Sequence, residues 1–500
     1  PLNPQWVPVS MCWTGGDVEG DRSSMESGKN ESALIKGIGA PPRGLALLMV
    51  LGPGLVWCGE YIGSGEVVLA TRTGAIFGVL VLWAPTVAIF SKFWIGLSGA
   101  RYTVCTGECM IDMLGRTPGP RHWVVWVVLI GQVCTGAIST AAVASVAAIF
   151  ASCFIPLPPF ILGWVITLGV IALVWSGRFD PLKKVMSLLV GVIILGVFDV
   201  ARTTWPGWTE PLFGLFGFRV PDLPAWAVTH YGIGPSPWGE ILPLLGWAAG
   251  GFASQVWYTY WVLGAGYGMA RGKHYGQPLD PDELRQIDAG AATRLRGWCR
   301  VVYVDATLAL LIGVTVTGAF MVAGAGVLGP AEIAPDGSKV ALELSRLFSD
   351  RWGALGAHLF ILAGLAAMIS TMLGQFAGWP RLLADCFRLL VPRVGRYSWA
   401  QQFRFILVCY AISNMLIVYT FGLTPVFLVK LGAILDGLLL TPLQALAVGL
   451  VLYLVMPRFF AEDARRILKP SPVFAAGLLL AFVVFGYFCV ARFPETIAMK

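Results

Sequence analysis

The chain alternates between long apolar blocks and shorter polar loops. Most of the blocks are roughly 20 residues or longer, which is the length of helix that crosses a lipid bilayer. We therefore predict an all-helical polytopic membrane protein with about eleven transmembrane helices. The blocks lie near residues 44–70, 75–98, 122–151, 157–176, 185–201, 240–266, 301–327, 353–376, 404–421, 424–456 and 471–491.

The composition supports this prediction. Of the 500 residues, 57% are hydrophobic and 13% are charged, whereas soluble domains carry roughly 25% charged residues. The net charge of +7 does not indicate a nucleic-acid partner, because the basic residues are spread over alternate loops. The predicted surroundings of the protein are lipid.

The distribution of Lys and Arg predicts the orientation of the helices. Cytosolic loops of membrane proteins are enriched in basic residues, so we predict a multi-pass protein of the cytoplasmic membrane with its N-terminus inside. The polar segment 1–43 is then a cytosolic tail. Within it, Met25 is a plausible start, and residues 1–24 are then not native. The basic loops cover residues 101–121, 178–184, 271–300, 381–404 and 458–469.

Two of the predicted helices carry glycine clusters at their middle. The first span reads "LGPGLVWCGEYIGSGEVV" and the sixth reads "LLGWAAGGFASQVWYTYW". Glycine destabilises a helix interior, so we predict breaks near Gly63–Gly65 and Gly250–Ser254. Unpaired backbone groups are tolerated at bilayer depth only where they line a cavity. The alternative is that these glycines let helices pack closely.

The two interrupted spans occupy equivalent positions in two groups of five helices. Paired interrupted helices are typical of inverted-repeat transporters, whose site lies near the middle of the membrane. We predict repeats at residues 44–201 and 240–456, joined by an extracytoplasmic loop at 202–239. Residues 457–500 then form a linker and an eleventh helix.

These segments resemble a known family. "LGPGLVWCGEYIGSGEVVLATRTGAIFG" is similar to the first span of Nramp-type divalent metal transporters, and "GRFDPLKKVMSLLVGVI", "YVDATLAL" and "STMLGQFAG" are similar to their later spans. The resemblance implies a LeuT-type fold, in which two inverted five-helix repeats precede an added eleventh helix.

The site positions depart from the family pattern. The family's metal-binding Asp falls on Gly63 and its Asn falls on Glu66. Its Met-Pro-His motif in the sixth span begins at Ala253 and ends at Gln255. Two acids of the third span that the family associates with proton movement fall on Thr140 and Val143. The chain therefore resembles a divergent branch, without the sulfur ligand that suits transition metals.

The sequence predicts a site built from hard oxygen donors. Glu66 is the expected main charged ligand, because an intramembrane acid is a functional candidate; the alternative is that it only caps the opened helix. Gly63, Ala253 and Gln255 are the other positions predicted for a metal. The predicted permeation path contains Glu60, Ser64, Gly65, Ser254, Thr140 and Gln375. Gln132, Asp305, Asn414 and Asp436 could line the path or bond neighbouring helices.

The leading hypothesis is a membrane transporter, symporter or uniporter, for a divalent metal cation such as magnesium or manganese. An amino-acid or amine carrier of the same fold and a non-transporting relative are the alternatives. No motif indicates an enzyme or a bound cofactor. The coupling ion, the transport direction and the oligomeric state do not follow from the sequence.

Overall fold

The structure is a computed structural model that describes residues 38–47, 50–176 and 180–498; most of the predicted N-terminal tail lies outside the described residues. The described residues form helices and connecting turns, without a strand. The part of the chain that we predicted as the first repeat contains α2 (Pro53–Tyr61), α3 (Thr71–Phe77), α4 (Trp83–Thr106), α5 (Met110–Gly115), α6 (Trp123–Ser152), α7 (Pro159–Ser176) and α8 (Asp180–Thr203).

Two short helices, α9 (Thr209–Phe216) and α10 (Ala225–Tyr231), separate this region from the second. The helices that follow are α11 (Trp238–Trp247), α12 (Phe252–Gly264), α13 (Pro281–Arg285), α14 (Ala289–Ala323), α15 (Val340–Leu390), α16 (Trp399–Phe421), α17 (Pro425–Gly432), α18 (Thr441–Leu450), α19 (Glu462–Leu468), α20 (Pro472–Tyr487) and α21 (Phe493–Ala498). This architecture confirms the prediction of an all-helical fold.

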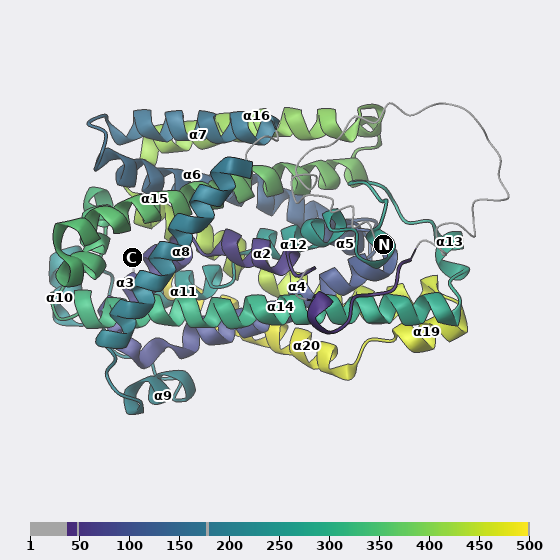
Figure 1. Cartoon of the computed structure of the whole chain (residues 1–500), viewed down its shortest axis with the longest axis horizontal. Coiled ribbons are helices and arrows are strands. Elements are labelled where there is room, and N and C mark those ends of the chain that lie inside the picture. Colours follow the sequence, from purple (N-terminus) through teal and green to yellow (C-terminus); the bar gives the residue numbers. More distant parts are fainter. Residues whose placement is uncertain (1–37, 48–49, 177–179, 499–500) are drawn as a thin grey trace.

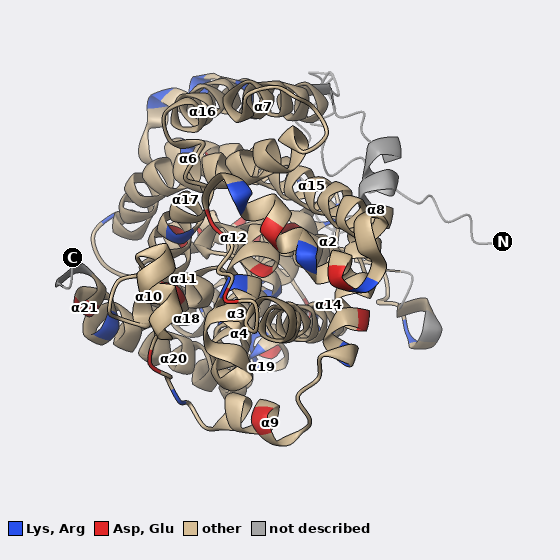
Figure 2. Cartoon of the chain, turned by 90° about the vertical axis from the view of Figure 1, so that its left-hand side faces the viewer, with Lys and Arg blue, Asp and Glu red and all other residues tan. Residues whose placement is uncertain are grey.

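The helices surround the two broken spans in layers. The long helices α14 and α15 run along the longest axis of the molecule, together with α6, α7 and α16 (Figure 1). Seen end on, α7 and α16 form an outer layer over α6 and α15, and the broken spans lie nearer the centre (Figure 2). Both α14 and α12 pack on α2 and on α4. Residues of the two breaks are therefore enclosed by complete helices.

The outer layer presents apolar side chains to the surroundings. Val165 and Leu168 of α7 are 59% and 53% exposed, and Phe405 and Ile412 of α16 are 71% and 54% exposed. Six helices of the described chain are long and apolar enough to cross a membrane, or seven with the bent first pair. The chain is an integral multi-pass membrane protein, and the count of eleven spans stays a prediction.

The predicted start of the second span is wrong. We predicted a helix over 75–98, whereas α4 begins at Trp83. Residues 75–81 instead complete the first span, where Gly78 adopts a φ of 66° and ends α3. The apolar pattern could not locate this boundary, because residues on both sides of Gly78 are apolar.

Candidate functional site

The first span breaks between α2 and a π-helical turn at Gly65–Ala70, and its two parts are bent by 49°. Ile62 leaves the helix with φ −73° and ψ 84°. Gly63 lies so close to α15 that a Cβ there would be 2.3 Å from Thr371 Oγ1. The glycine therefore permits a close approach between the opened chain and α15.

The sixth span breaks between α11 and α12. Ala249 and Gly250 have φ angles of 62° and 69°, a conformation that costs a residue with a Cβ more than it costs glycine. A Cβ on Gly251 would be 1.7 Å from Asp436 Oδ2. Both predicted interruptions are confirmed, and each contains a glycine that gives room to a polar side chain.

A cavity of about 30 Å³ lies between the two breaks. It is large enough for one water molecule or a partly dehydrated ion. Its lining residues come from both breaks, from α15 and from the tenth span: Glu60, Ser64, Gly65, Trp247, Gly250, Gly251, Ser254, Trp257, Thr371, Gln375, Trp379 and Asp436.

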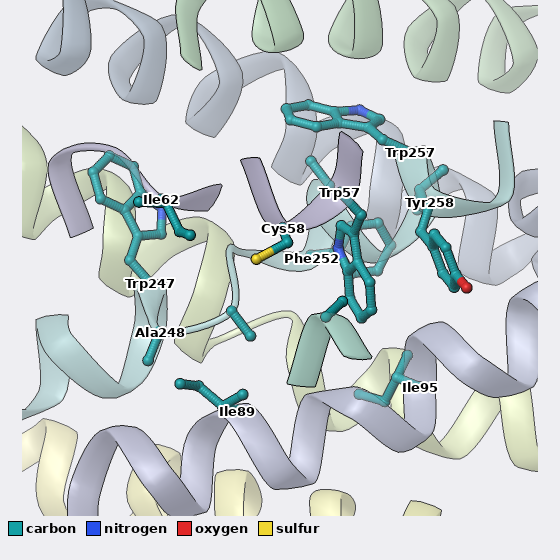
Figure 3. Close-up of a cluster of buried hydrophobic side chains, with 14 of the residues drawn as sticks. Trp57, Cys58, Ile62, Ile89, Ile95, Trp247, Ala248, Phe252, Trp257 and Tyr258 are labelled. Atoms are coloured by element: carbon teal, nitrogen blue, oxygen red, sulfur yellow. The ribbon is translucent and has the colours of Figure 1, made fainter. Parts of the chain in front are cut away.

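Glu60 brings one carboxylate to this cavity. Ser254 Oγ donates to Glu60 Oε2 at 2.7 Å, and Trp57 Nε1 donates to Ser254 Oγ at 3.2 Å. Thr371 Oγ1 donates to the Glu60 carbonyl at 3.2 Å. Trp57 is itself held by stacking on Tyr258, with ring centroids 4.5 Å apart (Figure 3). The carboxylate is thus positioned by residues of both broken spans.

Asp436 brings a second carboxylate from a π-helical turn at Ala433–Leu438. Its Oδ1 accepts from Gln132 Nε2 at 2.7 Å, and the carboxylate also accepts from the backbone amide of Ala253. Trp379 Nε1 donates to Gln132 Oε1 at 2.6 Å, which fixes the orientation of that amide. Irregular π-helical turns are frequent at functional sites.

Glu66 does not line the cavity. It is completely buried; its Oε2 accepts from the Gly63 amide at 3.3 Å, and its Oε1 accepts from Thr317 Oγ1 at 3.4 Å. The carboxylate reaches back across the break that precedes it. This geometry matches the capping alternative for Glu66.

The N-terminus of α2 is held by another intramembrane acid. Asp305 of α14 accepts from the amides of Gly52 and Gly54 at 3.1 and 2.5 Å, and from the Tyr258 hydroxyl at 3.1 Å. A carboxylate at a helix N-terminus is electrostatically favourable. Asp305 therefore anchors the first span to α14.

The predicted site residues divide into two groups. Glu60, Ser64, Gly65, Ser254 and Gln375 line the cavity. The remaining predicted residues face other partners or lie outside the lining, and they are Gly63, Glu66, Thr140, Ala253 and Gln255.

Two of these excluded residues have identifiable roles in packing. Thr140 Oγ1 pairs with the Tyr410 hydroxyl, and Gln255 Nε2 donates to the Ala249 carbonyl at 2.9 Å. Asp436 is the cavity acid that the sequence analysis placed only among secondary candidates. The signal that could have raised its rank was an aspartate inside an otherwise apolar span.

The donor set of the cavity consists of oxygen atoms and indole groups. Across the described ranges, no cluster of three or more His, Cys, Asp or Glu side chains is arranged to hold a metal. Two carboxylates, from Glu60 and Asp436, are supplemented by neutral oxygens. Such a set suits a hard cation that keeps part of its water shell.

Comparison with known proteins relates the chain to one family. Residues 54–232 match the sequence profile described as Natural resistance-associated macrophage protein-like, or Nramp. Curated protein sequences give no significant match.

Among solved structures, the chain is similar to the Eremococcus coleocola manganese transporter in complex with an aromatic bis-isothiourea substituted compound. The identity is 14%, 92% of each chain is covered, and the TM-score is 0.63. A mutant of the same transporter gives 0.64. MhsT in complex with L-phenylalanine, at 14% identity, gives 0.52 over 87% of this chain and 96% of that one.

These likenesses establish the fold, and the profile match places residues 54–232 within a named sequence family. The chain therefore has a LeuT-type fold, and its residues 54–232 resemble the Nramp family.

Proposed function

We propose that the protein carries a hard divalent metal cation across the cytoplasmic membrane by alternating access, with its N-terminus inside. The observation that carries this proposal is the cavity between the two breaks, into which Glu60 and Asp436 each bring a carboxylate. The similarity in fold to a manganese transporter supports the same substrate class.

The ligands proposed for the cation are oxygen atoms. Besides the two carboxylates, Gln375 lines the cavity, and its buried amide oxygen has no hydrogen-bond partner among the described residues. An unpaired buried acceptor is costly, and a cation would satisfy it. Ser254 supplies a hydroxyl. Magnesium and manganese suit such ligands, whereas a softer ion such as cadmium is disfavoured by the absence of sulfur from the lining.

The charges around the cavity also fit a divalent ion. Glu60, Glu66 and Asp436 are close enough to interact electrostatically with one another or with Lys92. When the two acids of the lining, Glu60 and Asp436, are both ionised, they bring two negative charges to the cavity. A buried net charge is unfavourable unless it is compensated, and one divalent cation compensates it fully.

The volume of the cavity argues against the amino-acid alternative. Pockets for organic ligands usually enclose roughly 300 Å³ or more, whereas this cavity encloses about 30 Å³. An amino acid would fit only if both breaks moved apart. A cation that keeps one or two waters is much smaller and requires a much smaller movement.

Calorimetric titration of the purified protein tests the proposal. We expect binding of magnesium and manganese and none of an amino-acid pool, with Glu60→Gln and Asp436→Asn each losing metal binding. Glu462→Gln, which changes an exposed acid paired with Arg466, is the matched control and should bind like the parent. Metal binding that survives both cavity substitutions would refute this site, and binding of amino acids instead would favour the organic carrier.

Transport is then measured in proteoliposomes. We expect uptake of magnesium or manganese by the parent and loss of uptake in Glu60→Gln. A protein that binds the cation but shows no uptake under any gradient of ions would be the non-transporting relative.

A further inference from the structure

A lysine is buried beside the cavity without an acidic ion-pair partner. Lys92 lies in the middle of α4 and its exposed fraction is 0%. None of the ion pairs in the described part of the chain includes it. A buried ammonium is costly unless its charge is compensated, so its surroundings must supply that compensation.

The carboxylates of Asp436 and Glu66 are close enough to interact with Lys92, and its hydrogen bonds come from the backbone of the sixth span. Lys92 Nζ donates to the carbonyls of Leu245 at 3.1 Å, Ala248 at 3.0 Å and Gly250 at 2.7 Å, and also to the carbonyl of Gly246. These residues belong to the end of α11 and to the break that follows it. The ring of Phe485, from α20, lies 5.3 Å from the ammonium.

These contacts satisfy the carbonyls that the break leaves without helical partners. The Leu244 carbonyl accepts from the Ala248 amide at 2.9 Å, and the Trp247 carbonyl accepts from the Gly250 amide at 2.7 Å. The Ala249 carbonyl accepts from Gln255. The four other carbonyls between residues 244 and 250 all bond to Lys92. Lys92 thus completes the hydrogen bonding of the broken segment.

The arrangement has the chemistry of a cation site. An ammonium has three N–H donors, yet four carbonyl oxygens surround this one, as ligands surround a metal ion. Carbonyl oxygens also form the sites that hold potassium ions in channels. The C-terminal end of α11 adds a partial negative charge.

We propose that the break of the sixth span is a monovalent-cation site that Lys92 occupies with its own ammonium. The ligand class of this carbonyl cage is ammonium, an alkylammonium or potassium. Because the lysine fills the cage permanently, the protein needs no free monovalent ion at this break. Gly250 belongs to both sites, because its carbonyl accepts from Lys92 and the residue also lines the cavity. The substrate cation then binds the carboxylates of the cavity and does not enter the cage.

Truncation of the lysine should empty the cage and open it to ions from solution. We expect Lys92→Ala to lower the Tm of the purified protein by about 5 °C or more in choline chloride. Methylammonium, ammonium or potassium chloride should restore much of that loss in a saturable manner. The parent should show no comparable response, because its cage is filled. EDTA throughout the measurement separates this result from any binding of divalent cations.

Lys92→Met is the matched control, since it fills a similar volume without a charge. We expect it to be destabilised and to show no rescue by monovalent cations. A Lys92→Met protein as stable as the parent, or a folded Lys92→Ala protein that responds equally to choline and potassium, would overturn the proposal.

The alanine variant is also produced in ammonium chloride, in case it does not fold in choline. Folded protein obtained only with ammonium supports the proposal. No folded protein under either condition overturns it, because an accessible cage would have been filled. The proposed divalent site is tested separately, by titration of the parent, so that either proposal can fail alone.

Discussion

The two broken spans stabilise the backbone groups that lack helical partners with side chains of opposite charge. In the first span, Glu66 accepts from the amide of Gly63, at the start of the second half of the helix. In the sixth span, Lys92 donates to carbonyls at the end of α11. Helix N-termini present unpaired amides and partial positive charge, and C-termini present unpaired carbonyls and partial negative charge. Each break therefore carries the charge that its own helix end requires.

The charged residues near the breaks therefore have two different roles. Some stabilise the interrupted backbone, and others face the cavity. Glu66 and Lys92 are occupied by backbone and side-chain partners, whereas Glu60 and Asp436 line the cavity. A carboxylate in a broken membrane helix is therefore not by itself a ligand. Its neighbours decide whether it caps the chain or binds a substrate.

The largest expected effect comes from exchanging the two glutamates of the first span for glutamine. We expect Glu60→Gln to weaken divalent-cation binding by at least about 30-fold, because loss of one buried charge from an ionic contact costs roughly 2–5 kcal/mol. Glu66→Gln should weaken it by less than about tenfold and lower the Tm instead. Titration calorimetry and thermal unfolding of both variants measure the contrast. Equal or reversed losses of affinity would return Glu66 to the role of main ligand.

Glycine substitutions at the two breaks sharpen the comparison further. A Cβ at Gly251 would meet the Asp436 carboxylate at 1.7 Å, and a Cβ at Gly63 would meet Thr371 Oγ1 at 2.3 Å. The Asp436 carboxylate is held by Gln132, so we expect Gly251→Ala to lower the free energy of unfolding by about 1–3 kcal/mol and to reduce cation affinity. Gly63→Ala should affect affinity less, because Thr371 is not a proposed ligand. Denaturation and titration of both variants test this order.

The sequence predicted the breaks better than the directions of the side chains. The clusters around Gly63 and Gly250 indicate a break from local chemistry alone, because glycine weakens any helix. The direction of Glu66 depends on Thr317, which lies 251 positions away in the chain. The importance of Asp436 depends on Gly251, which is also remote in sequence. Such contacts arise only from helix packing.

The contacts of Lys92 could not be predicted from the sequence either. A lone lysine in an apolar span usually extends toward the membrane surface, and its own segment holds no acid to pair with it. Its partners are backbone carbonyls of the sixth span. Every residue has such a carbonyl, so the sequence does not show which of them accept from a lysine. The fold class and the interrupted helices were therefore predictable, but the division between capping and binding charges was not.

A smaller effect is expected from the residue that positions Asp436. Gln132→Leu removes the 2.7 Å hydrogen bond to Asp436 and leaves the Trp379 indole without its acceptor. Loss of a group that orients a metal ligand typically reduces affinity 10–100-fold, and we expect about tenfold here. Gln402→Leu is the matched control, because its amide bonds to loop carbonyls near Val394. Unchanged affinity in Gln132→Leu would show that Asp436 needs no support from α6.

The smallest expected effect is at Ser254, the residue through which the sixth span touches the acid of the first. Ser254→Ala removes the 2.7 Å hydrogen bond to Glu60, and water or the cation itself can replace this donor. We therefore expect a loss of about 1 kcal/mol, or roughly fivefold in affinity. Ser345→Ala, whose hydroxyl donates to the Leu342 carbonyl within its own helix, should bind like the parent. A loss in Ser254→Ala as large as that in Glu60→Gln would mean that the hydroxyl is itself an essential ligand. The two breaks would then share the cation directly, instead of one break supporting the ligand of the other.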